Sequence, residues 1–376
     1  MSAADSGGGA LDDLLIVDFG RVLAGPYATM LLADLGARVV KIERPGAGDD
    51  TRAWGPPYAD GQATYFQAAN RNKESVAIDL RDPQGLAAAR DLVSRADVVV
   101  ENFLPGVMDR LGLGYDALTE VNPGVVFCSI TGFGGHNRLP GYDLLVQAVG
   151  GLMSITGQSP DEPTKVGVAL VDVVTGLHAA VGILAALRHR DRTGTGQRVE
   201  VNLLSSLLSG LANQSAGYVG AGAVPRAMGN AHPSVVPYQP FPTADRPLIL
   251  AVGNDRQFAA LARELGVPGL ADDPSFVDNA SRVEHREALV AELTELLAAD
   301  TADGWFTRLG AVGVPCGPVN DLAEAFALAD RLGLDPVVEI DDPRRDGPVR
   351  TVANPIGLSA TPAAYRTAPP RLGEDR

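Results

Sequence analysis

One acidic residue, Asp172, lies in an otherwise apolar stretch and is the strongest candidate for chemistry in this sequence. The polar residues between positions 166 and 187 are Asp172, Thr175 and His178. A stretch this apolar is long enough to cross a membrane, but a carboxylate and an imidazole are both costly in lipid. Basic residues at positions 188–190 and Gly194 are typical of a helix C-terminus. The pattern therefore predicts a helix buried in the core of a soluble protein.

Two interpretations of Asp172 are compatible with this pattern. Asp172 could be the N-cap of the helix, accepting backbone hydrogen bonds from residues 173–175. It could also be functional, because a carboxylate that faces a helix N-terminus stays ionised. An ionised and partly desolvated carboxylate can act as a nucleophile.

Other residue types that carry catalysis lack the necessary spacing. The five histidines are scattered and show no metal-ligand pattern, and the G-x-S-x-G elbow of serine hydrolases is absent. Ser205 and Ser206 fall in an apolar helical stretch that suits packing, and Cys316 falls in a turn flanked by prolines. We therefore expect no metal, and Asp172 is the best remaining nucleophile or base.

Composition narrows the possible partners and compartment. The chain has 376 residues, enough for two domains, and a net charge of −15, which disfavours nucleic acid and anionic membranes as partners. Cys128 and Cys316 form no disulfide framework, and the first residues lack the basic and apolar regions of a signal peptide. These features predict a soluble, reduced, cytoplasmic protein.

Strands alternate with helices along the first half of the chain, which predicts an α/β fold with a parallel sheet covered on both faces. The strands are expected at 14–18, 38–43, 75–80, 97–101, 124–130 and 197–202, with helices at 25–35 and 83–95 between them. The composition divides the chain into a large domain (11–216), a crossover linker rich in Gly, Pro and Ala (217–245), a small domain (246–325) and a C-terminal segment that returns to the large domain (326–376). Residues 1–10 are expected to form a tail.

Basic residues follow several of the predicted strands. They are Arg21, Arg44, Arg71, Lys73, Arg81 and Arg110. Ligands of an open α/β sheet bind at the carboxyl ends of its strands. Several arginines and lysines there would suit a ligand with several phosphates. Solvated surface charge is the alternative explanation for any single arginine. The glycines between Gly20 and Gly25 lack the G-x-G-x-x-G spacing, which argues against NAD or FAD.

Taken together, nine short stretches resemble the class III CoA-transferases, the family of formyl-CoA transferase and carnitine CoA-transferase that also contains the α-methylacyl-CoA racemases. The stretches are residues 18–26 (DFGRVLAGP), 40–46 (VKIERPG), 70–75 (NRNKES), 100–106 (VENFLPG), 141–143 (GYD), 170–176 (LVDVVTG), 229–233 (GNAHP), 237–239 (PYQ) and 313–318 (GVPCGP). They occur in family order from about Leu11 to the end of the chain, and such an ordered set is specific.

The resemblance implies a large Rossmann-like domain, a smaller α/β domain and two chains interlocked as a homodimer. It implies that Asp172 is the catalytic residue and that residues 229–232, with Gly229, Asn230 and His232, lie over the acyl site. The CoA contacts that it implies are Val22, Leu23, Ala24, Arg44, Ile78, Asp79, Leu80, Arg81, Asn102, Phe103, Arg110, Tyr142 and Asp143. It implies no tightly bound cofactor, since coenzyme A enters as the acyl-CoA substrate.

The implied activity is transfer of CoA from an acyl-CoA to a carboxylic acid through a mixed anhydride and an aspartyl-CoA thioester on Asp172. One alternative is a racemase, which needs a His-Asp pair where this chain has Tyr142-Asp143, unless His136 substitutes. Another is a non-catalytic acyl-CoA-binding protein in which Asp172 is only a cap. The Asp172→Asn variant tests this second alternative, because asparagine can still cap a helix but cannot act as a carboxylate nucleophile.

The sequence offers a weaker indication of the substrates. Residues 229–239 and 253–258 look similar to those of relatives that use dicarboxylic acids such as succinate and glutarate. Arg226, His232 or Arg282 could pair with the distal carboxylate of such a substrate, and surface charge or loop packing is the alternative explanation for each.

Overall fold

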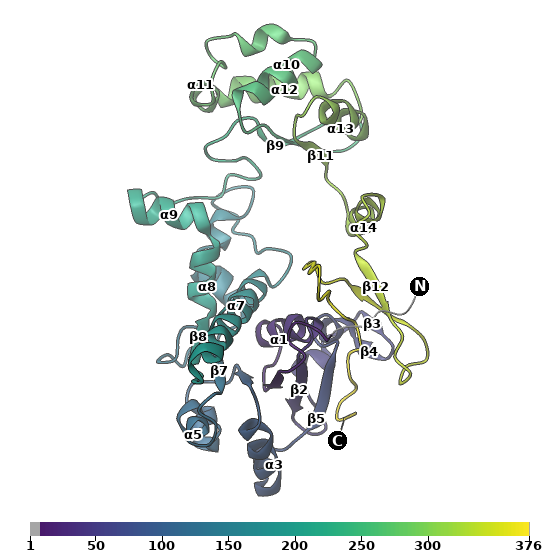
Figure 1. Ribbon diagram of the computed structural model, residues 1–376. Helices are drawn as coiled ribbons and strands as arrows, with labels where there is room; N and C mark the ends of the chain where they lie inside the picture. The colour runs from purple at the N-terminus through teal and green to yellow at the C-terminus, as the bar shows by residue number, and fades with distance from the viewer. Residues whose placement is uncertain (1–7, 376) are drawn as a thin grey trace. The chain divides into compact units, whose positions relative to one another are not determined.

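The computed structural model describes residues 8–375 and divides them into two compact units (Figure 1). Unit 1 contains the residues up to Leu152, Lys165–Val224 and the residues from Asp335 onward, and unit 2 contains Met153–Thr164 and Pro225–Leu334. Residues 153–164, expected in the large domain, thus belong to unit 2, and the expected linker 217–245 is divided between the units. Most of the expected N-terminal tail lies outside the described residues.

A six-stranded sheet forms the centre of unit 1, in the order β5-β2-β1-β6-β7-β8 with every neighbouring pair parallel. Its strands are β1 (Leu15–Asp18), β2 (Arg38–Glu43), β5 (Lys73–Ala77), β6 (Val98–Glu101), β7 (Val126–Thr131) and β8 (Arg198–Asn202). The predicted parallel α/β architecture is confirmed. Strand β5 was expected at 75–80 but runs from Lys73 to Ala77, because it pairs with β2 over that range, Val39 with Lys73 and Glu43 with Ala77.

Helices cover both faces of this sheet. Side chains point alternately to the two faces of a strand, and consecutive residues of β2, β6 and β7 are buried, so both faces are covered. One face packs Val17, Phe19, Val99 and Phe127 into a single apolar cluster with residues of α3, α4 and α5. The helices of unit 1 are α1 (Ala24–Asp34), α2 (Thr64–Gln67), α3 (Pro83–Ser94), α4 (Val107–Leu111), α5 (Tyr115–Val121), α6 (Asp143–Val149), α7 (Leu170–Thr193), α8 (Leu203–Gly210) and α9 (Ala212–Ala221).

Helix α7 contains the apolar stretch around Asp172 and packs against α1 and α8. The predicted helix is confirmed, and it ends at Gly194 with φ +75°. It is long and apolar enough to cross a membrane, but half of its most apolar window is buried inside the protein. The N-cap interpretation of Asp172 is wrong, because the N-cap position is Ala169 and Asp172 lies inside the first turn.

Unit 2 is built on a three-stranded antiparallel sheet in the order β11-β10-β9. Leu250, Phe258, Leu293 and Trp305 belong to its buried apolar cluster. Its elements are η2 (Met153–Ile155), β9 (Tyr238–Phe241), β10 (Leu248–Ala251), α10 (Asp255–Glu264), η3 (Pro268–Ala271), α11 (Asn279–Glu284), α12 (Arg286–Leu297), α13 (Ala302–Ala311), β11 (Cys316–Pro318) and α14 (Leu322–Arg331).

The last part of the chain packs on unit 1. Strands β12 (Val337–Ile340) and β13 (Val349–Val352) form a hairpin, and the carboxylate of Asp375 accepts a hydrogen bond from the backbone of Ser75 in β5 at 2.8 Å. The remaining elements of unit 1 are η1 (Asp50–Ala53), β3 (Tyr58–Ala59) and β4 (Gln62–Ala63).

Candidate active site

The order of the central strands reverses between β1 and β6, and a cavity of about 290 Å³ lies at their carboxyl ends. We call it the switch-point cavity. Its lining includes residues 21–24 after β1, residues 102–105 after β6, the segment after β7, and Asp172. Ligands bind at this place in doubly wound α/β folds, because loops that leave the sheet in opposite directions open a crevice there.

A second cavity, of about 600 Å³, shares Val22, Leu23, Tyr142 and Asp172 with the first. We call it the aromatic cavity, because Tyr27, Trp54 and Tyr65 contribute to its lining. Asp172 thus lies where a chain-like ligand in the first cavity would meet a group held in the second.

The carboxylate of Asp172 is buried, with 8% of the residue exposed. Burial, and then the negative charge of Asp143, raise the pKa of Asp172 to about 7. Burial and the charges of Asp172 and Asp143 also raise the pKa of Tyr65, so its phenol stays protonated. Asp172 was expected to stay ionised because it faces a helix N-terminus, but burial and the charge of Asp143 outweigh that effect and raise its pKa.

The first turn of α7 is capped from another helix. Oδ1 of Asp143, the first residue of α6, accepts hydrogen bonds from the backbone N–H groups of Val171 at 2.8 Å and of Asp172 at 3.1 Å. Oδ2 accepts a hydrogen bond from the side chain of Gln147, which also bonds the backbone of Val166. Asp143 therefore supplies the helix cap that one of the two interpretations assigned to Asp172.

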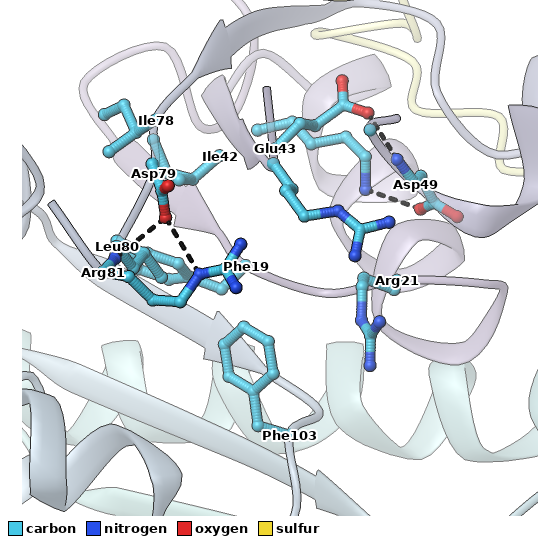
Figure 2. Close-up of a pocket in the computed structure, with 13 residues that line it drawn as sticks. Phe19, Arg21, Ile42, Glu43, Asp49, Ile78, Asp79, Leu80, Arg81 and Phe103 are labelled. Atoms are coloured by element: carbon cyan, nitrogen blue, oxygen red, sulfur yellow. Dashed lines mark hydrogen bonds and ion pairs between the residues drawn. The ribbon is translucent and has the colours of Figure 1, made fainter. Parts of the chain in front are cut away.

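A third cavity, of about 310 Å³, lies beside β1, β2 and β5 (Figure 2), and we call it the basic cavity. Three of the six basic residues expected here, Arg21, Arg44 and Arg81, line it. Arg71 and Lys73 do not, because they are buried in ion pairs with Asp34 at 2.7 Å and Asp18 at 3.1 Å. Arg110 is exposed and is not among the residues that line the three cavities.

The comparisons with known proteins agree with this geometry. CoA-transferase family III matches residues 11–376. The chain belongs to CoA-transferase family III. It is 40% identical to succinyl-CoA:glutarate CoA-transferase of Mus musculus over 97% of this chain and 84% of that protein. It is 42% identical to succinate–glutarate CoA-transferase of Agrobacterium fabrum over 97% of this chain and 93% of that protein. It is therefore an enzyme that transfers CoA from an acyl-CoA to a carboxylic acid.

A solved structure supports the same assignment. A CAIB/BAIF family protein from Brucella suis superposes with a TM-score of 0.86 at 41% identity, covering 98% of this chain and 97% of that one. The predicted family and the predicted parallel sheet are both confirmed.

Most of the CoA contacts implied by the family resemblance line the three cavities of the transferase. Residues 78–81, Arg44 and Phe103 line the basic cavity. Val22, Leu23, Ala24, Asn102, Phe103 and Tyr142 line the switch-point cavity, and Asp143 lines the aromatic cavity. Asn102 also bonds both backbone polar groups of Arg21, at 2.9 and 2.8 Å, and so joins the loops after β1 and β6.

The three residues expected at the acyl site belong to unit 2. Gly229 has φ +61°, and its N–H bonds the carbonyl of Gly157 at 2.9 Å. Asn230 pairs with Met228 in an isolated bridge, and the ring of His232 lies 5.2 Å from that of Tyr238. These contacts describe a structured loop, and its role at the acyl site stays a prediction.

Arg282 is not available to a substrate. Its side chain is fully buried and bonds Asp255 at 2.6 Å and the carbonyls of Val236 and Phe276, each at 2.9 Å. The guanidinium also stacks over Phe258. The suggestion that Arg282 pairs with a substrate carboxylate is therefore wrong, because protein groups already occupy its donors.

Sequence reasoning missed the aromatic lining of the second cavity. Trp54 and Tyr65 pack edge-to-face at 5.2 Å, in a region of short irregular elements. Neither residue follows a strand of the central sheet, so no periodic signal marked them. Among residues 8–375, no group of three or more His, Cys, Asp or Glu side chains could hold a metal ion.

Proposed function

We propose that Asp172 is the nucleophile of this CoA-transferase. The observation that carries the proposal is the position of its buried carboxylate in the lining of both the switch-point cavity and the aromatic cavity. A thioester has a long CoA part and a short acyl part, and the junction of two cavities is where its carbonyl would be bound.

The proposed reaction keeps the energy of the thioester through covalent intermediates of two kinds, mixed anhydrides and an aspartyl-CoA thioester. A carboxylate oxygen of Asp172 attacks the thioester carbonyl, the C–S bond breaks, and a mixed anhydride forms as CoA leaves as a thiolate. The thiolate then attacks the Asp172 carbonyl and releases the donor carboxylate. The acceptor carboxylate attacks the resulting aspartyl-CoA thioester, and the returning thiolate takes the acyl group from the new anhydride.

Ionisation of Asp172 sets the pH range of this reaction. Only the carboxylate form attacks, and a pKa of about 7 leaves roughly half of the free enzyme in that form at neutral pH. The same burial that raises the pKa also keeps water from the anhydride, so transfer competes well with hydrolysis.

We propose that the substrates are dicarboxylic acids, as in the two named relatives. The aromatic cavity suits the apolar part of such an acid, and Lys165 is the only Lys or Arg among its lining residues. Lys165 makes no ion pair within the described part of the chain, and its ammonium donates only to the carbonyl of Val166 at 3.3 Å. Arg226 and His232 of unit 2 remain alternatives for the distal carboxylate.

We further propose an interlocked homodimer that works in the cytoplasm. Apolar side chains of α7 at positions 177, 181 and 184 form one exposed stripe, and Val181 is 66% exposed. Val149 of α6 and Val219 of α9 are also exposed. Such a surface suits a subunit interface, and light scattering after gel filtration measures whether the mass is twice 39.1 kDa. The cysteines Cys128 and Cys316 are free, as in a reducing compartment.

The decisive experiment traps the acylated aspartate. The enzyme is incubated with succinyl-CoA, quenched with hydroxylamine and digested for peptide mass spectrometry. A hydroxamate on Asp172 that requires succinyl-CoA supports the nucleophile. Transferase activity without any label on Asp172, under conditions that convert a synthetic aspartyl thioester, contradicts it. The Asp172→Asn variant is the control for chemical background.

A further inference from the structure

The turn between β1 and α1 has an unusual backbone for its sequence. Val22 has φ +69°, a left-handed conformation that β-branched residues strongly disfavour. Val22 and Leu23 line both cavities that contain Asp172, and Arg21 lines the basic cavity and the switch-point cavity. A strained turn at this place has to be held by the groups around it.

A buried ion pair bonds this turn at two points. The carboxylate of Asp49 accepts the Val22 N–H, with its two oxygens at 3.2 and 3.3 Å. The ammonium of Lys41 lies 3.0 Å from Asp49 and donates to the carbonyl of Gly20 at 2.6 Å. Both charged side chains are fully buried, and Figure 2 shows Asp49 and Glu43 above Arg21 at the basic cavity.

Neighbouring groups fix the ion pair itself. Asp49 accepts hydrogen bonds from the hydroxyl and the N–H of Thr51, at 2.8 and 3.0 Å. Its own N–H donates to Glu43 at 2.9 Å. On the other side of the turn, Asp18 accepts the Gly20 N–H at 2.7 Å. The turn thus receives side-chain hydrogen bonds from several elements of unit 1.

We propose that the Lys41–Asp49 ion pair is a positioning element for catalysis, which holds Val22 in its left-handed conformation and so shapes the wall beside Asp172. A buried ion pair is weak evidence for stability, because desolvation offsets most of its attraction. Its contacts here are with the backbone of one strained turn, which gives the pair a specific use. The inference rests on the proposed role of Asp172 as the nucleophile, but it does not depend on which carboxylic acid is the substrate.

A double-mutant cycle tests this role. Asp49→Asn keeps the side-chain shape but removes the charge that pairs with Lys41. We expect kcat to fall roughly 10- to 100-fold, by a larger factor than KM for acyl-CoA rises. Glycine adopts a positive φ without strain, so a turn with Gly at position 22 should keep its left-handed conformation with less help from Asp49. In the Val22→Gly background, the same Asp49→Asn change should therefore lower kcat only a few-fold. Equal losses in the two backgrounds would overturn the proposal.

A matched control separates positioning from stability. Asp34 is also buried in an ion pair, with Arg71 at 2.7 Å, and lines none of the three cavities. Asp34→Asn should lower the melting temperature and leave kcat unchanged at temperatures where the variant is folded. An equal loss of kcat in Asp34→Asn would count against a special role for Asp49.

Two further measurements keep the test decisive. Thr51→Val removes one hydrogen bond to Asp49 and keeps both charges of the ion pair. We expect a smaller fall in kcat than in Asp49→Asn, and this variant still tests the proposal if Asp49→Asn does not fold. The rate of hydroxamate formation on Asp172 should fall with kcat. A wild-type enzyme without any hydroxamate refutes the nucleophile, whereas equal labelling rates in the wild type and these variants refute only the positioning role.

Discussion

Oδ1 of Asp143 lies 3.1 Å from the backbone nitrogen of Asp172 and accepts its hydrogen bond. One carboxylate thus caps the helix on which the other is carried, although 29 residues separate them in the chain. The same proximity raises the pKa of Asp172 beyond the effect of burial. Orientation and acidity of the candidate nucleophile therefore depend on one neighbour.

Asp143→Asn should move the pH dependence of the enzyme to lower pH. The amide oxygen can still accept the N–H groups of Val171 and Asp172, but the negative charge that raises the pKa of Asp172 is removed. Burial remains, so the pKa should fall from about 7 without reaching its ordinary value of 3.8. The profile of kcat/KM between pH 5 and 8 reports this pKa in the free enzyme. A midpoint that stays or rises would contradict the prediction.

Asp172→Asn should abolish transfer while the protein still binds acyl-CoA. Loss of a covalent nucleophile lowers kcat by roughly 1,000-fold or more, and the asparagine fills nearly the same space. The measurements are steady-state transfer and the dissociation constant of a non-reacting CoA thioether. Retained transfer would support a protein in which Asp172 has only a structural role.

The same variant should be more stable than the wild type at alkaline pH. The pKa of Asp172 is about 7 in the folded protein and has the ordinary value of 3.8 in the unfolded chain. Between these pH values, the folded protein therefore binds more protons at Asp172 than the unfolded chain does. The contribution of Asp172 to stability therefore falls as pH rises through this window. Asp172→Asn should gain up to roughly 4 kcal/mol in the free energy of unfolding at pH 8, and little at pH 4. Urea unfolding at both pH values measures the difference, and a gain independent of pH would refute the cause given.

Lys165→Met should reduce the preference for dicarboxylic substrates. If the ammonium at the aromatic cavity pairs with a distal carboxylate, kcat/KM should fall roughly 10- to 100-fold for succinyl-CoA and remain similar for butyryl-CoA, which has the same chain length. Lys165→Arg should retain the preference. Arg226→Met tests the alternative in unit 2, and a loss of preference there but not in Lys165→Met would transfer the role to Arg226.

Arg282→Met should destabilise unit 2 without changing substrate preference. The change leaves the carbonyls of Val236 and Phe276 without their donor and removes the partner of Asp255. Leaving buried acceptors unsatisfied costs about 1–3 kcal/mol each. Thermal unfolding should show a lower melting temperature, while the ratio of kcat/KM for succinyl-CoA and butyryl-CoA stays at the wild-type value. A changed ratio would restore Arg282 as a substrate contact.

The sequence was sufficient to predict the sheet and to single out Asp172 as a candidate, because both leave local signals. Strand and helix periods alternate along the first half, and a carboxylate inside an apolar stretch stands out at once. Arg44 and Arg81 were correctly placed at the basic cavity because both follow strands of the central sheet. Each of these inferences needs only residues that are near in sequence.

The errors concern contacts between distant residues. Arg71 and Lys73 were grouped with Arg81, but they lie at the start of β5 and not after its end, and ion pairs with Asp34 and Asp18 of other elements bury them. Asp172 looked like a cap because its real substitute, Asp143, is on another helix. The left-handed conformation of Val22 has no sequence signal, since valine is among the residues least expected to adopt it.

The return of the chain to unit 1 has a consequence for biosynthesis. Strand β5 is made before most of unit 2, yet the backbone of Ser75 in β5 bonds Asp375, which is made after unit 2, and Arg345 bonds the adjacent Glu374. The segment that forms most of unit 2 is complete in the nascent chain before these residues leave the ribosome. Synthesis of unit 1 therefore begins before that of unit 2 and continues after it, so the β5 edge lacks its contacts with residues 374 and 375 until unit 2 has been made.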